Sequence, residues 1–385
     1  MDGYLRFMLS GKAHTDVKKV REYIDGGCNI NLKFMMGEKL SGTILHWSVR
    51  HGFQELVEVL LRKGSNVEET TSGVSITPLA MAVTLKLYEI VRLLLYHNAD
   101  VNAEFENGIT AMHGAAANGD LSMVRLLLEH GFIASKHPLL MHRAVSSGSF
   151  DIVKLFSEAK CPVDELDYNG FAPIHVAAQV AHYKILFFLI DVAKANPLLI
   201  TSPNCSTILH LCCTKTTILS VLQKILSYGL DTEVADKDGS TPLIISVIHK
   251  SLNNVRLLVK LGADLSASDF NGDTAFHIAA RNKTNDIGRF LFESEADVYQ
   301  TNNDGISPYD LVDDIIREKI ITERVQGDIE NYVLEMEKII SAQRYRIAKL
   351  ENTVSTQGER IVKIEEKNLE LEKCLSEVYK FIQKK

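Results

Sequence analysis

The sequence predicts an all-α protein in which stacked helix pairs, joined by short β-hairpins, form a solenoid that is followed by a long C-terminal coiled-coil helix. Two observations support this prediction. A helix-start motif returns about every 33 residues between positions 42 and 313, which is typical of repeat architectures. From residue 329 onward, apolar residues follow a seven-residue spacing, which is typical of a coiled coil.

The recurring motif combines a helix cap with apolar and small residues. It reads GTILHWSV at 42–49, ITAMHGAA at 109–116, STILHLCC at 206–213 and DTAFHIAA at 273–280. Its threonine can accept an unpaired backbone N–H at the start of a helix, and a proline at the next position, as at Pro78 and Pro242, loses no hydrogen bond there. Counted from the threonine position, the fourth residue of the motif in repeats one to nine falls at positions 46, 80, 113, 142, 175, 210, 244, 277 and 310.

A second helix is expected after each motif. Segments such as EIVRLLLYHNADVNA and NNVRLLVKLGADLSA place apolar residues at i, i+3 and i+4, the pattern of a helix buried on one face. Asn-Gly or Asp-Gly dipeptides, which favour tight hairpin turns, begin at positions 107, 169, 238, 271 and 304. This order of elements resembles the ankyrin repeat, and the resemblance implies an ankyrin-repeat α-solenoid with β-hairpin fingers.

The predicted array covers residues 35–312, with a degenerate capping repeat at 1–34 and a capping helix and linker at 313–328. Terminal units need a polar outer face because one of their sides has no neighbouring repeat. In the ninth unit, Asp310, Asp313 and Asp314 replace apolar or small residues. We interpret these acids as a solvated face of the capping helix and not as a metal site.

Histidine occupies the fourth motif position in six repeats. Stacked helices lie roughly 8–10 Å apart, whereas the ligands of one metal ion lie about 2 Å from it, so neighbouring repeats cannot share an ion. We therefore interpret these histidines as structural groups that hydrogen-bond within their repeat, as the ankyrin resemblance also implies. The adjacent Cys212 and Cys213 replace small residues and are expected to be buried fillers. The six motif histidines are His46, His113, His142, His175, His210 and His277.

Composition and motifs argue against catalysis and against nucleic-acid binding. The net charge is −7, whereas a protein that binds nucleic acid or an anionic membrane needs a basic surface. The chain contains no phosphate-binding glycine loop, nucleophile elbow, HExxH or kinase motif, and no CxxC pair. We therefore expect a non-enzymatic intracellular protein of the cytoplasm or nucleus, with no cofactor, no metal and no membrane insertion.

The resemblance implies that partner proteins bind at the hairpin tips and on the concave face of the first helices. Aromatic tip residues are favoured because they dominate interface hot spots. Two irregularities interrupt the pattern: the step from His113 to His142 leaves no room for a full finger, and a long loop at 192–206 carries an apolar PLLI segment that is expected to dock locally. The first is either a binding notch or a degenerate repeat. The candidate contact residues are Phe105, Glu106, Tyr168, Asn169, Phe171, Lys237, Asp238, Phe270 and Asn271.

The heptad pattern predicts a coiled coil over 329–385. Its a positions are mostly β-branched and include the polar Asn368, both of which favour two parallel strands. Flanking charges would pair with opposite sign between identical chains, so a parallel homodimer is expected; a heterodimer and a single solvated helix are the alternatives. VSTQG at 354–358 is the predicted weak point. The residues expected to carry dimerisation are Val333, Ile340, Ile347, Leu350, Val354, Ile361, Ile364, Asn368, Leu371 and Leu375.

These features together predict an intracellular adaptor that binds a target protein through its array and dimerises through its coil. The alternative is a viral or symbiont effector that mimics a host ankyrin protein and occludes its target. An adaptor needs two linked binding faces, whereas an occluding inhibitor needs only one. Removal of the coil therefore separates the two functions.

Overall fold

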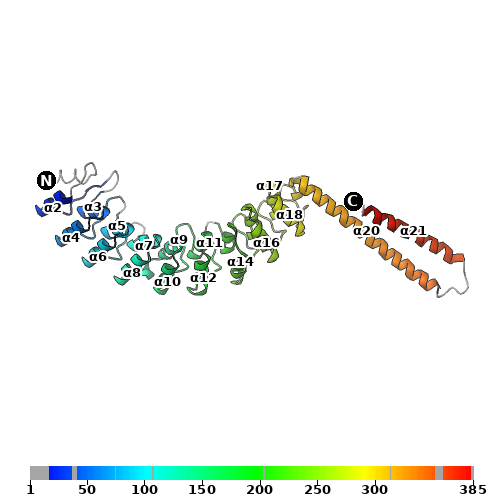
Figure 1. Cartoon of the computed structure of the whole chain (residues 1–385), viewed down its shortest axis with the longest axis horizontal. Helices are drawn as coiled ribbons and strands as arrows, with labels where there is room; N and C mark the ends of the chain where they lie inside the picture. Colours follow the sequence, from blue (N-terminus) through cyan, green and yellow to red (C-terminus); the bar gives the residue numbers. More distant parts are fainter. Residues whose placement is uncertain are drawn as a thin grey trace. The chain divides into compact units, whose positions relative to one another are not determined.

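A computed structural model describes residues 17–36, 41–73, 75–105, 108–202, 204–312, 314–351 and 359–382. The chain consists of two compact units, Met1–Phe270 and Asn271–Lys385. Figure 1 shows the order of their helices along the chain. The predicted fold class is confirmed: the protein is built mainly of helix pairs with ankyrin-type spacing, and a long helix follows them.

The first unit contains a row of inner helices and a row of outer helices, and the inner row lies on the concave side of the arc that this unit forms (Figure 1). A short helix, α2 (Val17–Asp25), precedes both rows. The inner helices are α3 (Ile44–Arg50), α5 (Pro78–Thr84), α7 (Ala111–Ala117), α9 (Leu140–Ser146), α11 (Pro173–Gln179), α13 (Ile208–Cys213) and α15 (Pro242–Ile248). The outer helices are α4 (Gln54–Arg62), α6 (Tyr88–Tyr96), α8 (Leu121–Glu129), α10 (Phe150–Glu158), α12 (Tyr183–Asp191), α14 (Leu219–Leu226) and α16 (Leu252–Lys260).

The inner helices begin where the motif predicts. The hydroxyl oxygen of Thr77 accepts the N–H of Ala80 at 3.2 Å, and Pro78 occupies the first helical position. The same cap recurs at Thr241 and Pro242. Because both helix rows bury their apolar stripes, large side chains lie in a continuous core, and burial of each stabilises the fold by roughly 1.5–3 kcal/mol. Fully buried examples are Leu79, Leu94, Met112, Met123 and Phe156.

The hairpin fingers are short, and regular strand pairing is limited. In the first finger, β1 (Phe34–Met35) pairs antiparallel with β2 (Ser41–Gly42), with Phe34 opposite Gly42. The glycine of the Asn-Gly or Asp-Gly turn has positive φ in each of the five predicted fingers, for example +75° at Gly170 and +80° at Gly239. This left-handed backbone favours glycine because it has no Cβ.

The second unit completes the array and adds two long helices. It contains α17 (Ala275–Arg281), α18 (Asn285–Glu293), α19 (Pro308–Leu311), α20 (Asp314–Glu351) and α21 (Glu359–Ile382). The first turns of α20 bury Ile316 and Ile320, and the Cδ1 atom of Ile316 packs beside Gly288 of α18. The start of α20 thus serves as the outer helix of the last repeat.

The C-terminal helices differ from the predicted single coil in two ways. One helix, α20, begins at residue 314 and continues without a break into the heptad region. The heptads are also divided between two helices: α21 contacts α20 of the same chain and runs antiparallel to it (Figure 1). The predicted weak point at 354–358, with Val354, lies outside the described residues.

The heptad assignment itself agrees with the burial of the side chains. Among the described side chains of residues 329–382, every a or d residue is buried or half-buried, and every residue at another heptad position is exposed. Val333 and Ile340 are the most buried of the set. The side chains of Leu350, Ile361 and Ile364 lie outside the described part of these helices. The predicted apolar stripe therefore faces a helix of its own chain in this structure.

Candidate protein-binding surface

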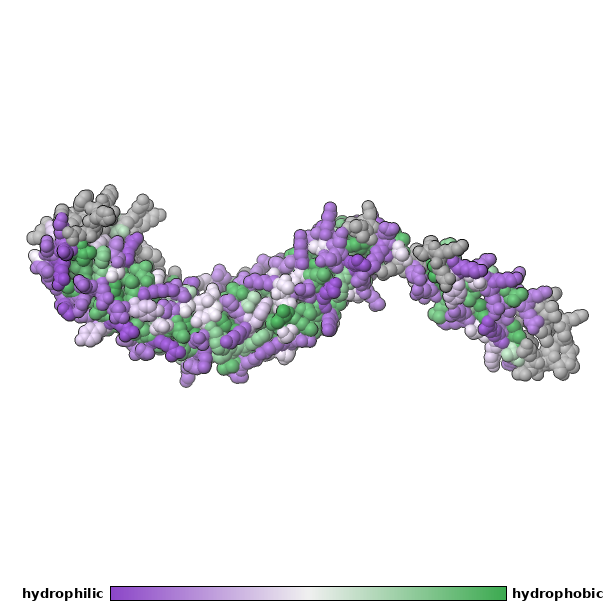
Figure 2. All heavy atoms as spheres, in the orientation of Figure 1, coloured by the Kyte–Doolittle hydropathy of each residue, from purple (hydrophilic) through white to green (hydrophobic). Residues whose placement is uncertain are grey.

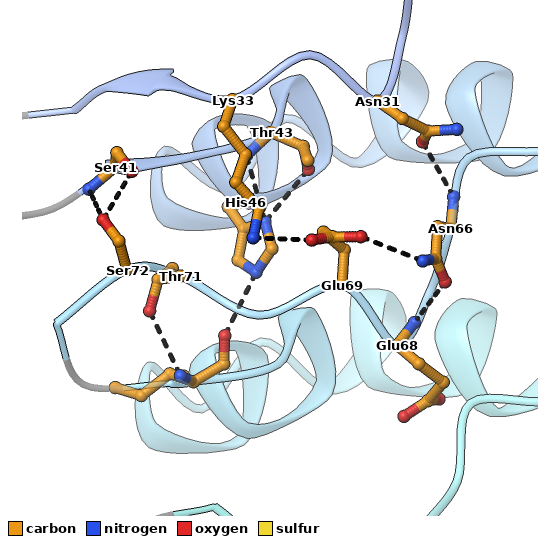
Figure 3. A network of polar contacts seen from close by, with 11 residues as sticks. Asn31, Lys33, Ser41, Thr43, His46, Asn66, Glu68, Glu69, Thr71 and Ser72 are labelled. Carbon is orange, nitrogen blue, oxygen red and sulfur yellow. Dashed lines mark hydrogen bonds and ion pairs between the residues drawn. The ribbon is translucent and has the colours of Figure 1, made fainter.

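The motif histidines connect successive repeats. The N–H of Thr43 donates to Nδ1 of His46 at 3.3 Å, and Nε2 of His46 lies 3.1 Å from the carbonyl oxygen of Ile76 in the next finger. Because Nδ1 accepts, the ring is neutral with its proton on Nε2, which donates to that carbonyl. Burial lowers the pKa of His46 to about 4, which keeps the ring neutral. Figure 3 shows this pair of contacts beside the Lys33–Glu69 ion pair.

The contact with the next finger recurs in four other repeats, although Nδ1 of His142 has no hydrogen-bond partner among the described residues, so the interpretation of the histidines as structural groups is confirmed and extended. Each bridge reaches the next finger, whereas the sequence predicted bonds within one repeat only. The second nitrogen lies beside a carbonyl oxygen at His142–Phe171 (2.7 Å), His175–Leu199 (2.9 Å), His210–Ser240 (3.1 Å) and His277–Ile306 (3.0 Å).

His113 is different because the finger that would follow it is missing. The shortened segment forms a 3-10 turn at Ala134–Lys136 and then places the buried ring of His137 next to His113. The rings of His113 and His137 meet edge to face with centroids 5.9 Å apart. Phe132 stacks on the ring of His137, with centroids 5.0 Å apart. Nδ1 of His137 lies 3.6 Å from a carboxylate oxygen of Glu104. Packed aromatic rings therefore occupy this place, which favours the degenerate repeat over the binding notch.

Each finger is numbered here by the repeat whose inner helix it precedes. Fingers five to eight hydrogen-bond to one another through their backbones. The N–H of Ser202 donates to the carbonyl of Gly170 at 3.0 Å, and the N–H of Lys237 donates to Asn204 at 3.0 Å. The N–H of Phe270 then donates to the carbonyl of Asp238 at 3.1 Å. These three bonds place four fingers side by side in one row, which presents their tips on a common edge.

The predicted tip residues differ in exposure. Tyr168 is 78 % exposed and Phe270 is 70 % exposed, so both rings present much of their surface at the edge of this row. Asn169, Lys237, Asp238 and Asn271 are also exposed, whereas Phe105 and Phe171 are half-buried. Phe171 supplies the carbonyl that His142 contacts, so it belongs in part to the frame. Glu106 lies outside the described residues.

Three exposed apolar residues near these tips were not among the predicted contacts. Leu198 and Ile200 lie in the long loop before finger six, and Leu166 precedes Tyr168 in finger five. The expectation that the PLLI segment docks locally is wrong for Leu198 and Ile200, because both are exposed. Leu198 lies in a turn that the side chain of Asn196 stabilises by accepting the N–H of Leu198 at 3.0 Å, a local geometry that the apolar letters PLLI alone do not reveal. Figure 2 shows apolar residues among polar ones on the surface of the array.

The acidic residues of these fingers have structural partners. Asp167 accepts the N–H groups of Asn169 and Phe171 at 2.9 Å, and Asp236 does the same for Asp238 and Ser240. Asp310 is exposed, as predicted, and it also caps α19 by accepting the N–H of Ser307 at 2.9 Å. Asp313 lies outside the described residues, and nothing is described of the Asp314 side chain.

Groups suited to hold a metal ion are absent from the described residues, in which no three His, Cys, Asp or Glu side chains gather as ligands. Cys212 and Cys213 are buried as predicted, and burial raises the pKa of both thiols. None of the helices within the described ranges is long and apolar enough to cross a membrane.

Comparison with known proteins identifies related sequences along the array. The family described as ankyrin repeats (3 copies) matches residues 7–105, 113–201 and 209–302. The chain is 38 % identical over 89 residues to the B-cell lymphoma 3 protein homolog of Mus musculus, which covers 23 % of this chain and 20 % of that protein. It is 31 % identical over 149 residues to the nuclear factor NF-kappa-B p105 subunit of Gallus gallus, which covers 35 % of this chain and 15 % of that protein.

A viral protein is also similar. The putative ankyrin repeat protein FPV014 of fowlpox virus is 30 % identical over 139 residues, which covers 35 % of this chain and 32 % of that protein. This chain thus aligns with less than a third of the length of each of these three relatives. The family match covers most of the helix pairs described above. The chain therefore belongs to the ankyrin-repeat family, whose repeats form protein–protein interaction modules.

Proposed function

We propose that this protein is a non-enzymatic adaptor that binds a target protein through its fingers and the concave face of its inner helices, and that associates with itself through residues 329–382. The observation that supports target binding is the row of bonded fingers between Asp167 and Phe270. The row holds exposed aromatic rings on a rigid edge, so binding costs little conformational entropy.

The exposed rings of Tyr168 and Phe270 supply the hot-spot chemistry of this edge. Aromatic residues bury a large area with few rotatable bonds, which makes them the residues most often found at the centre of interfaces. Leu166, Leu198 and Ile200 extend the apolar surface around Tyr168. We place the main contact on fingers five to eight for this reason.

Affinity capture with the full chain tests target binding. The double variant Tyr168→Ala/Phe270→Ala should lose the captured target, whereas Tyr96→Ala should retain it. Tyr96 is the matched control because its ring is 81 % exposed but lies at the end of the outer helix α6. Equal capture by the double variant and the wild type would contradict the proposed surface.

Self-association is the second part of the proposal. The predicted parallel homodimer uses the a and d residues that α20 and α21 bury against each other, so that dimer requires the two helices to separate. Two linked arrays can engage two sites on one target at the same time. The resulting avidity would exceed the affinity of a single array for one site by roughly 10²–10⁴-fold. Sedimentation of the full chain at micromolar concentration tests this part, and a monomer there would contradict it.

A second candidate function, occlusion of a target by a single array, is favoured by the similarity to the fowlpox ankyrin protein. The two candidates differ in their need for the C-terminal helices. A chain truncated at residue 325 should lose its effect on the target protein if bridging is the mechanism. Full activity of the truncated chain would support occlusion instead.

A further inference from the structure

The two long C-terminal helices have one polar edge. Heptad positions are counted here with Val333 and Ile340 at a in α20 and Leu375 at a in α21. The guanidinium of Arg344 pairs with the carboxylate of Glu372, and the hydroxyl of Tyr379 donates to Glu337 at 2.9 Å. All four residues occupy e positions, and a step of seven residues along α20 corresponds to a step of seven back along α21. The e edge is therefore closed by polar contacts within the chain.

The opposite edge consists of g positions, because antiparallel helices that pair e with e place their g residues together on the other side. Tyr332 and Ile339 of α20 are exposed there, and so are Cys374 and Phe381 of α21. Toward the turn of the hairpin the same edge carries two exposed basic residues, Arg346 and Lys367. These six residues define the g edge.

Apolar g residues are unnecessary for a two-helix pair. A seam of a and d residues is enough for two helices, whereas helices that also carry apolar residues at e or g belong to bundles with further neighbours. The other exposed apolar residues, Leu334, Tyr345 and Leu369, occupy b and f positions away from this edge. Figure 2 shows apolar residues on the visible face of the hairpin among charged ones.

We propose that the g edge binds the g edge of a second copy of this chain, so that two intact hairpins form a four-helix bundle. The order of residues along the edge selects this partner. The aromatic Tyr332 and Phe381 lie at the end away from the turn, Ile339 and Cys374 lie in the middle, and Arg346 and Lys367 lie near the turn. A twofold axis through the middle places the basic end of each copy on the aromatic end of the other.

This arrangement pairs groups that attract each other. The guanidinium of Arg346 and the ammonium of Lys367 can bind the aromatic faces of Tyr332 and Phe381 of the other copy through cation–π contacts. The two copies of Ile339 meet near the axis. Such self-complementarity is what a twofold interface requires. The inference rests on the proposed self-association of residues 329–382, but it differs from the parallel coil because the a and d residues stay buried within each chain.

Sedimentation of the full chain and of two matched variants tests the edge. Ile339→Arg puts a third basic residue at the centre of the g edge and should raise the dimer dissociation constant by roughly tenfold or more. Leu334→Arg is the matched control, because Leu334 is 51 % exposed and Ile339 is 46 % exposed, but Leu334 occupies position b of the same helix. This variant should leave the dimer dissociation constant unchanged. Equal effects of the two variants would overturn the proposal.

A covalent lock distinguishes this dimer from the parallel coil. Glu337→Cys/Tyr379→Cys, in a chain with Cys205→Ser and Cys374→Val, which keeps the g edge apolar, allows a thiol crosslinker to join α20 to α21 within one chain. The chain must sediment as the wild type does before the crosslinker is added. A denaturing gel confirms that the crosslink is intramolecular. If the locked chain still dimerises, the hairpin dimer is supported. Dimerisation only of the unlocked chain would overturn this inference and leave the proposed self-association standing, whereas a monomer in both forms would overturn both.

Discussion

Nε2 of His210 lies 3.1 Å from the carbonyl oxygen of Ser240, thirty residues further along the chain. The N–H of Thr207 donates to the other ring nitrogen at 3.2 Å, so one buried imidazole caps its own helix and holds the next finger. A short-range helix cap and a long-range contact therefore depend on the same side chain. His46, His175 and His277 have the same dual role, which gives histidine a structural reason to recur at this motif position.

Replacement of His210 should cost more stability than replacement of His113. His210→Ala removes a cap and a bridge, and we expect a loss of roughly 2–3 kcal/mol. His113→Ala removes the cap contact with Thr110 and the ring contact with His137, and we expect roughly 1–2 kcal/mol. Urea denaturation of the two variants measures the difference. A greater loss for His113→Ala would contradict the bridging role of these histidines.

Stability should fall as the pH drops below about 6.5. Burial lowers the pKa of His46 and of His113 to about 4, whereas an unfolded histidine titrates near 6.5. The unfolded chain thus binds protons before the folded chain does, and each such histidine costs about 1.4 kcal/mol per pH unit between these values. Thermal melts at pH 7.5 and pH 5.0 test this, and the His113→Gln variant should show a smaller drop. A melting temperature independent of pH across this window would refute the expectation.

Loss of the exposed finger rings should weaken target binding more than it weakens the fold. Tyr168→Ala and Phe270→Ala should each reduce affinity by roughly 1–2 kcal/mol. Tyr168→Ala should leave the melting temperature unchanged, whereas Phe270→Ala should lower it slightly because its ring lies beside Gly239. Calorimetric titration and thermal melts provide both quantities. If both variants melt far below the wild type, the rings belong to the frame and not to the contact surface.

The contact between fingers seven and eight should depend on Gly239. A Cβ atom there would lie 2.7 Å from the backbone nitrogen of Phe270, and the glycine has φ of +80°. Gly239→Ala should therefore cost roughly 2–3 kcal/mol through strain and a displaced finger. Gly262→Ala is the matched control, because its φ is +91° but no atom lies within 4 Å, and about 1 kcal/mol is expected. Similar losses in denaturant titrations would show that the fingers do not need this close approach.

Replacement of Asn368 should stabilise the C-terminal hairpin. Its Oδ1 atom is buried without a hydrogen-bond partner, which is unfavourable for a polar atom. Asn368→Leu should raise the hairpin stability by about 1 kcal/mol in thermal melts followed by circular dichroism. Asn331→Leu, at an exposed position of α20, should have little effect. A destabilised Asn368→Leu hairpin would show that the amide has a partner in solution, such as its copy in a parallel dimer.

The sequence predicted the array well because each repeat carries its own local instructions. Thr77 and Pro78 start a helix, Gly170 and Gly239 turn a finger, and a period of about 33 residues repeats these choices. The structural role of the histidines also followed from spacing. Their bridges to the next finger did not, because a contact between repeats leaves no local pattern in the sequence. The predicted contact residues and the domain limits stay predictions.

The coil shows a different limit of sequence reasoning. The heptads correctly separate the buried positions, such as Val333 and Ile340, from the exposed ones. A heptad does not encode the direction of the partner helix or the chain that supplies it, so an antiparallel helix of the same chain satisfies the pattern as well as a parallel copy does. Flanking charges, Glu372 among them, were assigned to a parallel partner, whereas Glu372 instead pairs with Arg344 of its own chain.

The missing finger beside His113 has a consequence for how strongly neighbouring repeats are coupled when the array unfolds locally. Repeats one and two share a histidine bridge and a backbone bond between Ser41 and Ser72, and repeats four and five share the bridge from His142. From repeat two to repeat four, the described fingers supply neither kind of bond. Helix packing and side-chain contacts, such as those of Tyr88 with Asp120 and of Asn102 with Ile133, couple neighbours there. In a linear array, weak nearest-neighbour coupling divides the chain into separate cooperative blocks. Hydrogen exchange should therefore begin at finger amides between Phe105 and His137, which makes this stretch the compliant segment of the first unit.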